Sequence, residues 1–116
     1  NAVESLRRAG FNIHSPSSEN PKIEVGFAEN KDPLICFSKK YDAPSNPSDS
    51  FVAIMTCDEA NEACPVVSGA DFKFSLTYSD PKISDGTEKE SETYDERCFQ
   101  IASEMFYLFN KIATHG

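Results

Sequence analysis

The stretch that best indicates the fold class is Phe51-Val52-Ala53-Ile54-Met55, which is apolar throughout and is followed by Thr56-Cys57-Asp58. Such a run is typical of a parallel strand covered by helices on both faces. The next strand is predicted over Phe72 to Tyr78, where apolar and polar residues alternate before Asp80. Ligands of open parallel sheets bind where the strands reach their carboxyl ends. The sequence therefore predicts an α/β fold with Cys57 and Asp80 at one edge of the sheet.

The segment before this strand is predicted to hold a short helix and a hairpin. Asn1 to Ala9 follows a helical period, with a capping box formed by Asn1 and Glu4 and a left-handed C-cap at Gly10. A strand is expected over Phe11 to His14, and Ile23–Phe27 and Leu34–Phe37 are expected to pair as a hairpin. The loop that follows, from Ala43 to Ser50, is rich in Pro, Ser and Asn.

The last segment predicts a long helix that begins with a capping box over Thr87 to Glu90. Its apolar residues recur at helical spacing and are expected to pack on the sheet. This apolar stripe consists of Tyr94, Cys98, Ile101, Ala102, Met105, Phe106, Phe109 and Ile112.

Composition excludes several classes of protein. The 116 residues are 39% hydrophobic, as expected of a single globular domain that spans 1-116. A net charge of -8 is unfavourable for binding nucleic acid or an anionic membrane. The chain has no apolar run near the roughly 20 residues that span a bilayer. A cytoplasmic protein is expected.

The four cysteines fall into two groups. Cys36 in a strand and Cys98 on the helix stripe are expected to be small core residues. Cys57 and Cys64 stand seven positions apart and are either a redox pair or two unrelated thiols. Neither the cysteines nor His14 and His115 have the spacing of a zinc site, so no metal and no cofactor is predicted.

Asp80 precedes Pro81 and has two interpretations of its own. Ser-Asp-Pro commonly opens a turn in which the carboxylate caps its own backbone. Alternatively, a carboxylic acid held at the rim of a pocket can protonate a leaving oxygen as a general acid.

Several of these motifs together resemble the low-molecular-weight protein tyrosine phosphatase superfamily, and within it most closely the thioredoxin-coupled arsenate reductases. The similarity extends over nearly the whole chain. Its most specific parts are the Cys57 and Cys64 pair, with Pro65 after Cys64, and the Asp80-Pro81 step. The matching segments are Asn1-Ala2-Val3-Glu4, Arg8-Ala9-Gly10-Phe11, Val52 to Ala60, Cys64-Pro65-Val66-Val67, Gly69-Ala70, Tyr78-Ser79-Asp80-Pro81, Asp85-Gly86-Thr87 and Tyr94 to Cys98.

The resemblance implies a thiol mechanism on an arsenate or phosphotyrosine-type oxyanion. A cysteine of the phosphate loop attacks the oxyanion, and Asp80 matches the general acid that protonates the leaving oxygen. Cys57 and Cys64 match the second and third cysteines of the reductases, which end as a disulfide that thioredoxin reduces. Lys82 and Ile83 follow Asp80-Pro81, where the phosphatases commonly have Tyr residues, and this favours an inorganic oxyanion.

The chain departs from the family in one essential respect, because it contains no Cys followed by five residues and an Arg. The resemblance therefore implies an N-terminally truncated three-layer fold that lacks the nucleophile and is inactive alone. Loss of a strand from inside a sheet would expose an unpaired edge and favour self-association. The alternative is a non-catalytic, redox-sensitive binding module on the same scaffold.

Overall fold

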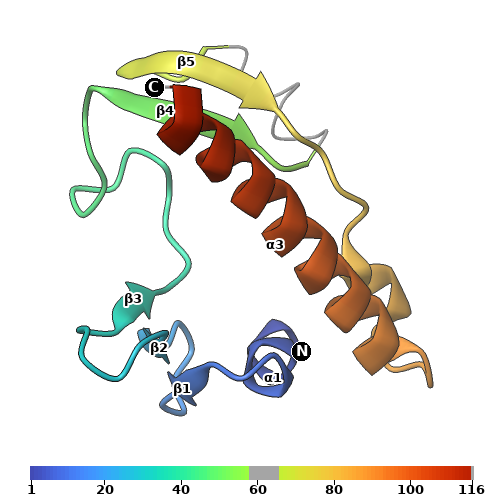
Figure 1. Ribbon diagram of the computed structural model, residues 1–116. Coiled ribbons are helices and arrows are strands. Elements are labelled where there is room, and N and C mark those ends of the chain that lie inside the picture. The colour runs from blue at the N-terminus through green and yellow to red at the C-terminus, as the bar shows by residue number, and fades with distance from the viewer. Residues whose placement is uncertain (58–65, 116) are drawn as a thin grey trace. The chain divides into compact units, whose positions relative to one another are not determined.

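The computed structural model describes residues 1–57 and 66–115, and its secondary structure is mixed α/β (Figure 1). Backbone contacts divide the chain into two compact units. The first unit consists of Asn1–Phe37 and Pro81–Gly116, and the second unit is Ser38–Asp80. The prediction of a single domain over the whole chain stays a prediction.

The first unit begins with helix α1, Ala2–Arg8, as the sequence predicts. Gly10 has φ 100°, the Gly10 N–H donates to Arg7 O at 3.0 Å, and the Phe11 N–H donates to Leu6 O at 3.1 Å. These two bonds form a Schellman motif, which confirms the glycine C-cap. The predicted capping box is wrong, because the Asn1 side chain caps nothing and instead donates to Asp85 Oδ1 at 3.0 Å.

Three strands of the first unit form an antiparallel sheet in the order β1-β2-β3. The strands are β1 (Asn12–His14), β2 (Ile23–Gly26) and β3 (Leu34–Cys36). Pairing of Ile23 with Cys36 and of Val25 with Leu34 confirms the predicted hairpin. Strand β1 starts one residue later than predicted, since the Phe11 N–H is engaged by the end of α1.

Two strands of the second unit, β4 (Phe51–Met55) and β5 (Ala70–Ser75), form a parallel pair. This confirms the parallel relation that the sequence predicts. The predicted cover on both faces is wrong: Val52, Phe72 and Phe74 are 52%, 65% and 56% exposed. The physical reason is that a two-stranded sheet has few neighbours to cover it, and β4 pairs with β5 alone among the described strands.

The chain returns to the first unit through the short 3-10 helix η1 (Pro81–Ser84) and ends in α3 (Glu90–His115). Helix α3 is present as predicted, but the capping box differs. The Glu90 carboxylate accepts from the Gly86 N–H at 2.6 Å, while the Thr87 N–H is already donated to Ser84 O at 3.0 Å.

The apolar stripe of α3 is less buried than predicted. No described residue of the helix is buried, and Phe106, Phe109 and Ile112 are each more than half exposed. The hydrogen bonds that join α1 to α3, and α3 to the turn after η1, involve Ser91, Tyr94 and Asp95, all in the N-terminal half of the helix. Side chains farther along the stripe therefore lack that cover.

Among the described helices none is long and apolar enough to cross a bilayer.

Candidate functional site

The carboxyl ends of β4 and β5 carry the two described residues of the predicted oxyanion site. Beyond the strands, the Leu76 N–H donates to Met55 O at 2.9 Å and the Tyr78 N–H donates to Thr56 O at 3.0 Å. Parallel pairing thus continues to Thr56 on one strand and Tyr78 on the other. Cys57 comes one residue later and Asp80 two residues later, so both lie at the same edge of the sheet.

The Cys57 side chain is exposed, and Asp80 is exposed as well. Cys64 lies outside the described residues, so its pairing with Cys57 stays a prediction. The roles of Asp80, Cys57 and Cys64 remain those that the family resemblance implies. The structure shows the strand pair that precedes two of these residues: β4 leads to Cys57 and β5 leads to Asp80, and the two strands are parallel.

The remaining cysteines differ in burial. Cys98 on α3 is partly buried, in line with a packing residue. The prediction that Cys36 is a core residue is wrong, because its thiol is exposed. Strand β3 contacts one neighbour, β2, and both of its faces are open to solvent. In the described part of the chain no three His, Cys, Asp or Glu side chains are grouped so as to hold a metal ion.

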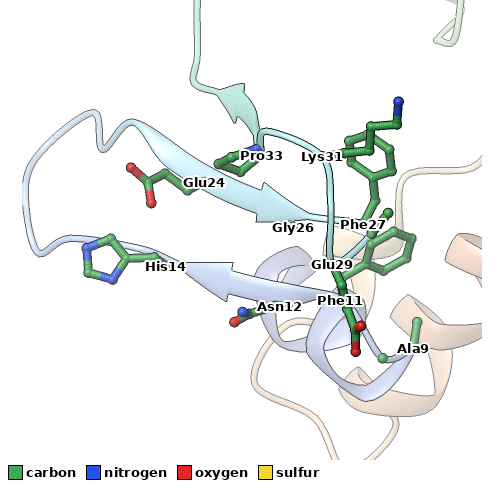
Figure 2. Close-up of a pocket in the computed structure, with 12 residues that line it drawn as sticks. Ala9, Phe11, Asn12, His14, Glu24, Gly26, Phe27, Glu29, Lys31 and Pro33 are labelled. Carbon is green, nitrogen blue, oxygen red and sulfur yellow. The ribbon is translucent and has the colours of Figure 1, made fainter.

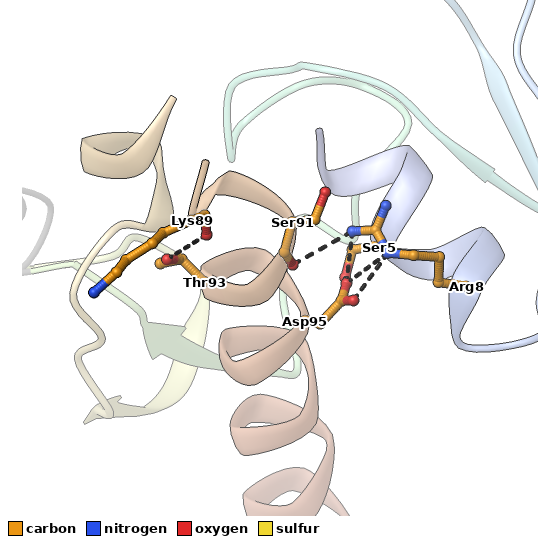
Figure 3. A network of polar contacts seen from close by, with 6 residues as sticks. All are labelled: Ser5, Arg8, Lys89, Ser91, Thr93 and Asp95. Carbon is orange, nitrogen blue, oxygen red and sulfur yellow. Dashed lines mark hydrogen bonds and ion pairs between the residues drawn. The ribbon is translucent and has the colours of Figure 1, made fainter. Parts of the chain in front are cut away.

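A polar network fixes the N-terminal half of α3 against α1 (Figure 3). Arg8 donates through Nη2 to Asp95 Oδ1 at 2.7 Å and through Nε to Asp95 Oδ2 at 2.9 Å. The buried Ser5 hydroxyl donates to the same carboxylate at 2.7 Å. The Arg8 bond, followed by the Ser5 bond, lowers the pKa of Asp95, and the pair raises the pKa of Arg8. This network is a structural clamp within the first unit.

A second clamp holds the turn after η1, the helix that directly follows Asp80. Asp85 Oδ1 accepts from Asn1 Nδ2 at 3.0 Å and from the Tyr94 hydroxyl at 2.9 Å. The buried Ser84 hydroxyl donates to Pro81 O at 2.8 Å and closes η1 on itself. These bonds tie η1 to α1 and to α3.

The first unit also contains a hollow of about 620 Å³ beside β1 and β2 (Figure 2). Its polar lining includes Asn12, His14, Glu24, Glu29 and Lys31, and the rings of Phe11 and Phe27 border it. The sequence pattern predicts the hairpin but no site on it. A signal was present, since Glu24 and Gly26 alternate with Ile23, Val25 and Phe27, and such alternation predicts one polar sheet face.

Comparison of the chain with protein-family models, with curated proteins and with solved structures finds no match.

Proposed function

We propose that this chain is the portion of a cysteine-dependent arsenate reductase, or of a low-molecular-weight protein tyrosine phosphatase, that carries the general acid and the redox relay. Asp80 is the acid, and Cys57 and Cys64 are the relay thiols. The observation that supports this proposal best is the parallel pairing of β4 and β5, which brings Cys57 and Asp80 to one sheet edge. The three-layer fold of that superfamily belongs to the same proposal.

In the proposed reaction the nucleophile comes from a phosphate loop outside these residues, since the chain has no Cys followed by five residues and an Arg. Its thiolate attacks arsenic and forms an S–As bond, while Asp80 gives a proton to the oxygen that leaves as water. Rigid placement of Asp80 matters because proton transfer requires hydrogen-bond distance to the leaving oxygen.

The relay thiols then complete the reduction. The Cys57 thiolate attacks the nucleophile's sulfur, an S–S bond forms, and the electron pair of the broken S–As bond stays on arsenic, which leaves as arsenite. Cys64 next attacks the Cys57 sulfur, releases the nucleophile's thiolate and leaves a Cys57–Cys64 disulfide. An external dithiol such as thioredoxin supplies the two electrons that restore both thiols. The exposed Cys57 sulfur is accessible for these exchanges.

The residues after Asp80 favour arsenate over a phosphotyrosine side chain. Lys82 and Ile83 lie in η1, and Ile83 is almost fully exposed. An aromatic ring at this place could pack on an aromatic substrate, whereas an aliphatic side chain beside a lysine offers no such surface. We therefore assign the relay to an inorganic oxyanion.

The absence of the Cys and Arg motif also favours a second candidate, a redox-sensitive binding module without catalysis. In that module the Cys57–Cys64 disulfide would itself be the signal, and it would pair with a partner rather than with a substrate. The two candidates share the disulfide but differ in turnover.

The experiment that tests the proposal has two stages. First, the chain is equilibrated in glutathione buffers and digested, and mass spectrometry is used to find a peptide linked through Cys57 and Cys64. Cys57→Ser and Cys64→Ser should abolish the link, while the control Cys36→Ser, which alters another exposed thiol, should retain it.

Second, arsenate reduction and phosphate-ester cleavage are measured on the protein expressed together with a phosphate loop. Cys57→Ser or Cys64→Ser should stop arsenite release and spare ester cleavage, and Asp80→Asn should slow both by about a hundredfold or more. Arsenite release by both serine variants would refute the relay. A disulfide without any turnover would favour the binding module.

A further inference from the structure

The hollow is lined by residues of β1 and β2 and by residues that flank these strands. The register pairs Asn12 with Gly26, Ile13 with Val25 and His14 with Glu24. Since side chains alternate between faces, Val25, which is 8% exposed, belongs to the covered face. Asn12, His14 and Glu24 share the opposite face.

Gly26 keeps the floor of this hollow open. It is the cross-strand partner of Asn12, and a Cβ atom at Gly26 would lie 3.2 Å from the Asn12 carbonyl oxygen. A side chain there would crowd Asn12, since its Cβ atom would also lie 3.3 Å from the Asn12 Cβ atom. The resulting volume of about 620 Å³ lies within the range of small-molecule sites.

The charged groups around the hollow have no partner in the part of the chain that the structure describes. Within the described residues, the carboxylates of Glu24 and Glu29 make no hydrogen bond or ion pair, and neither does the Lys31 ammonium. In Figure 2 the Lys31 and Glu29 side chains point in opposite directions. Other carboxylates of the first unit, such as Asp85 and Asp95, accept hydrogen bonds from neighbouring side chains.

The charged groups and the aromatic rings around the hollow indicate the chemical class of its ligand. Two carboxylates stand against one ammonium, and the net charge of the chain, -8, repels anions from this surface. Phe11 and Phe27 are 38% and 51% exposed, and aromatic faces attract cations as well as apolar groups. The same chain already has a cation over a ring, with Lys22 Nζ 5.7 Å from the Phe37 ring centre.

We propose that this hollow binds a small organic cation, an ammonium group attached to an apolar body. Glu24 and Glu29 supply the negative charge, and the rings of Phe11 and Phe27 pack against the apolar part. The hollow belongs to the first unit, while Cys57 and Asp80 belong to the second, so cation binding and oxyanion chemistry can be tested independently.

The test is an NMR titration of the ¹⁵N-labelled chain with phenethylammonium chloride. The expected result is a saturable shift of amides in β1 and β2, with neutral 2-phenylethanol binding about tenfold more weakly and 3-phenylpropanoate more weakly still. Equal affinity for the amine and the alcohol on the unmodified chain would overturn the proposal, as would shifts that do not saturate.

Substitutions then test whether the carboxylates of Glu24 and Glu29 bind the ammonium group. Glu24→Gln and Glu29→Gln should each weaken amine binding about threefold to fivefold. The matched control Glu92→Gln removes an exposed carboxylate on α3, outside the hollow, and should leave the affinity unchanged. If the double variant of Glu24 and Glu29 binds the amine as tightly as the unmodified chain, the site is not a cation site.

Discussion

The antiparallel sheet of the first unit and the parallel pair of the second unit differ in how far their apolar side chains are buried. In the antiparallel sheet Val25 is buried, whereas in the parallel pair Val52, Phe72 and Phe74 are each more than half exposed. Parallel strands normally occur with both faces covered, because the connecting helices lie on them. The antiparallel sheet therefore covers an apolar side chain at its central strand β2, while the parallel pair has an apolar face that is open to further packing.

The largest expected difference between the two sheets is in the free energy of unfolding when a carboxylate replaces one apolar side chain of each sheet. Val25→Asp should reduce the free energy of unfolding by about 4 kcal/mol, since it removes a buried apolar group and buries a charge. Phe72→Asp should cost about 1 kcal/mol or less, because this side chain is already exposed. Urea unfolding followed by circular dichroism measures both. Equal losses at the two positions would show that the parallel face is covered in solution.

A second difference between the two units concerns the backbone at two glycines with positive φ. Gly69 in the second unit has φ 85°, and a Cβ atom there would lie 2.0 Å from the Ser48 carbonyl oxygen. Gly69→Ala should cost about 3 kcal/mol, because both conformation and space oppose it. The control is Gly10→Ala in the first unit. Gly10 has φ 100°, but a Cβ atom there would meet nothing within 4 Å, so this substitution should lower the free energy of unfolding by about 1 kcal/mol. Comparable losses in the two thermal unfolding curves would contradict the close approach at Ser48.

The smallest expected effect is the pH dependence of the α1–α3 clamp. The folded pKa of Asp95 lies below its ordinary value of 3.8, so the clamp stabilises the fold fully above that pH. The contribution is lost as the pH falls from 3.8 through the folded pKa. Asp95→Asn should therefore lower the melting temperature at neutral pH and flatten its acid dependence. A matched change at Asp71, an exposed carboxylate of β5, should leave that dependence as it is.

Local patterns in the sequence were sufficient for most elements of the fold. Alternation predicts the hairpin of β2 and β3, the apolar run predicts β4, and Gly10 predicts the end of α1. The two capping boxes failed for different reasons: Glu90 accepts from the nearby Gly86 N–H, whereas the Asn1 side chain has a partner far away in the sequence. Asn1 donates to Asp85, and no local rule anticipates that bond.

Burial was less predictable than secondary structure. An apolar stripe shows which face of α3 would be buried if something covered it, but not how far along the helix the cover extends. The placement of Cys57 and Asp80 at one edge was predictable, because it needs only two parallel strands in sequence order. The hollow was not, since it depends on how the loop after β2 brings Phe27 and Glu29 beside Phe11.

The clamp between α1 and α3 joins residues that are 90 positions apart, Ser5 and Asp95. The β2–β3 hairpin closes a loop of about eight residues, so bringing α1 onto α3 costs about 2 kcal/mol more in chain entropy. Within the first unit the hairpin is thus the inexpensive contact to form, and the joining of the two ends of the chain is the slow and costly one. From loop entropy alone we expect the β2–β3 hairpin to form before α1 docks on α3.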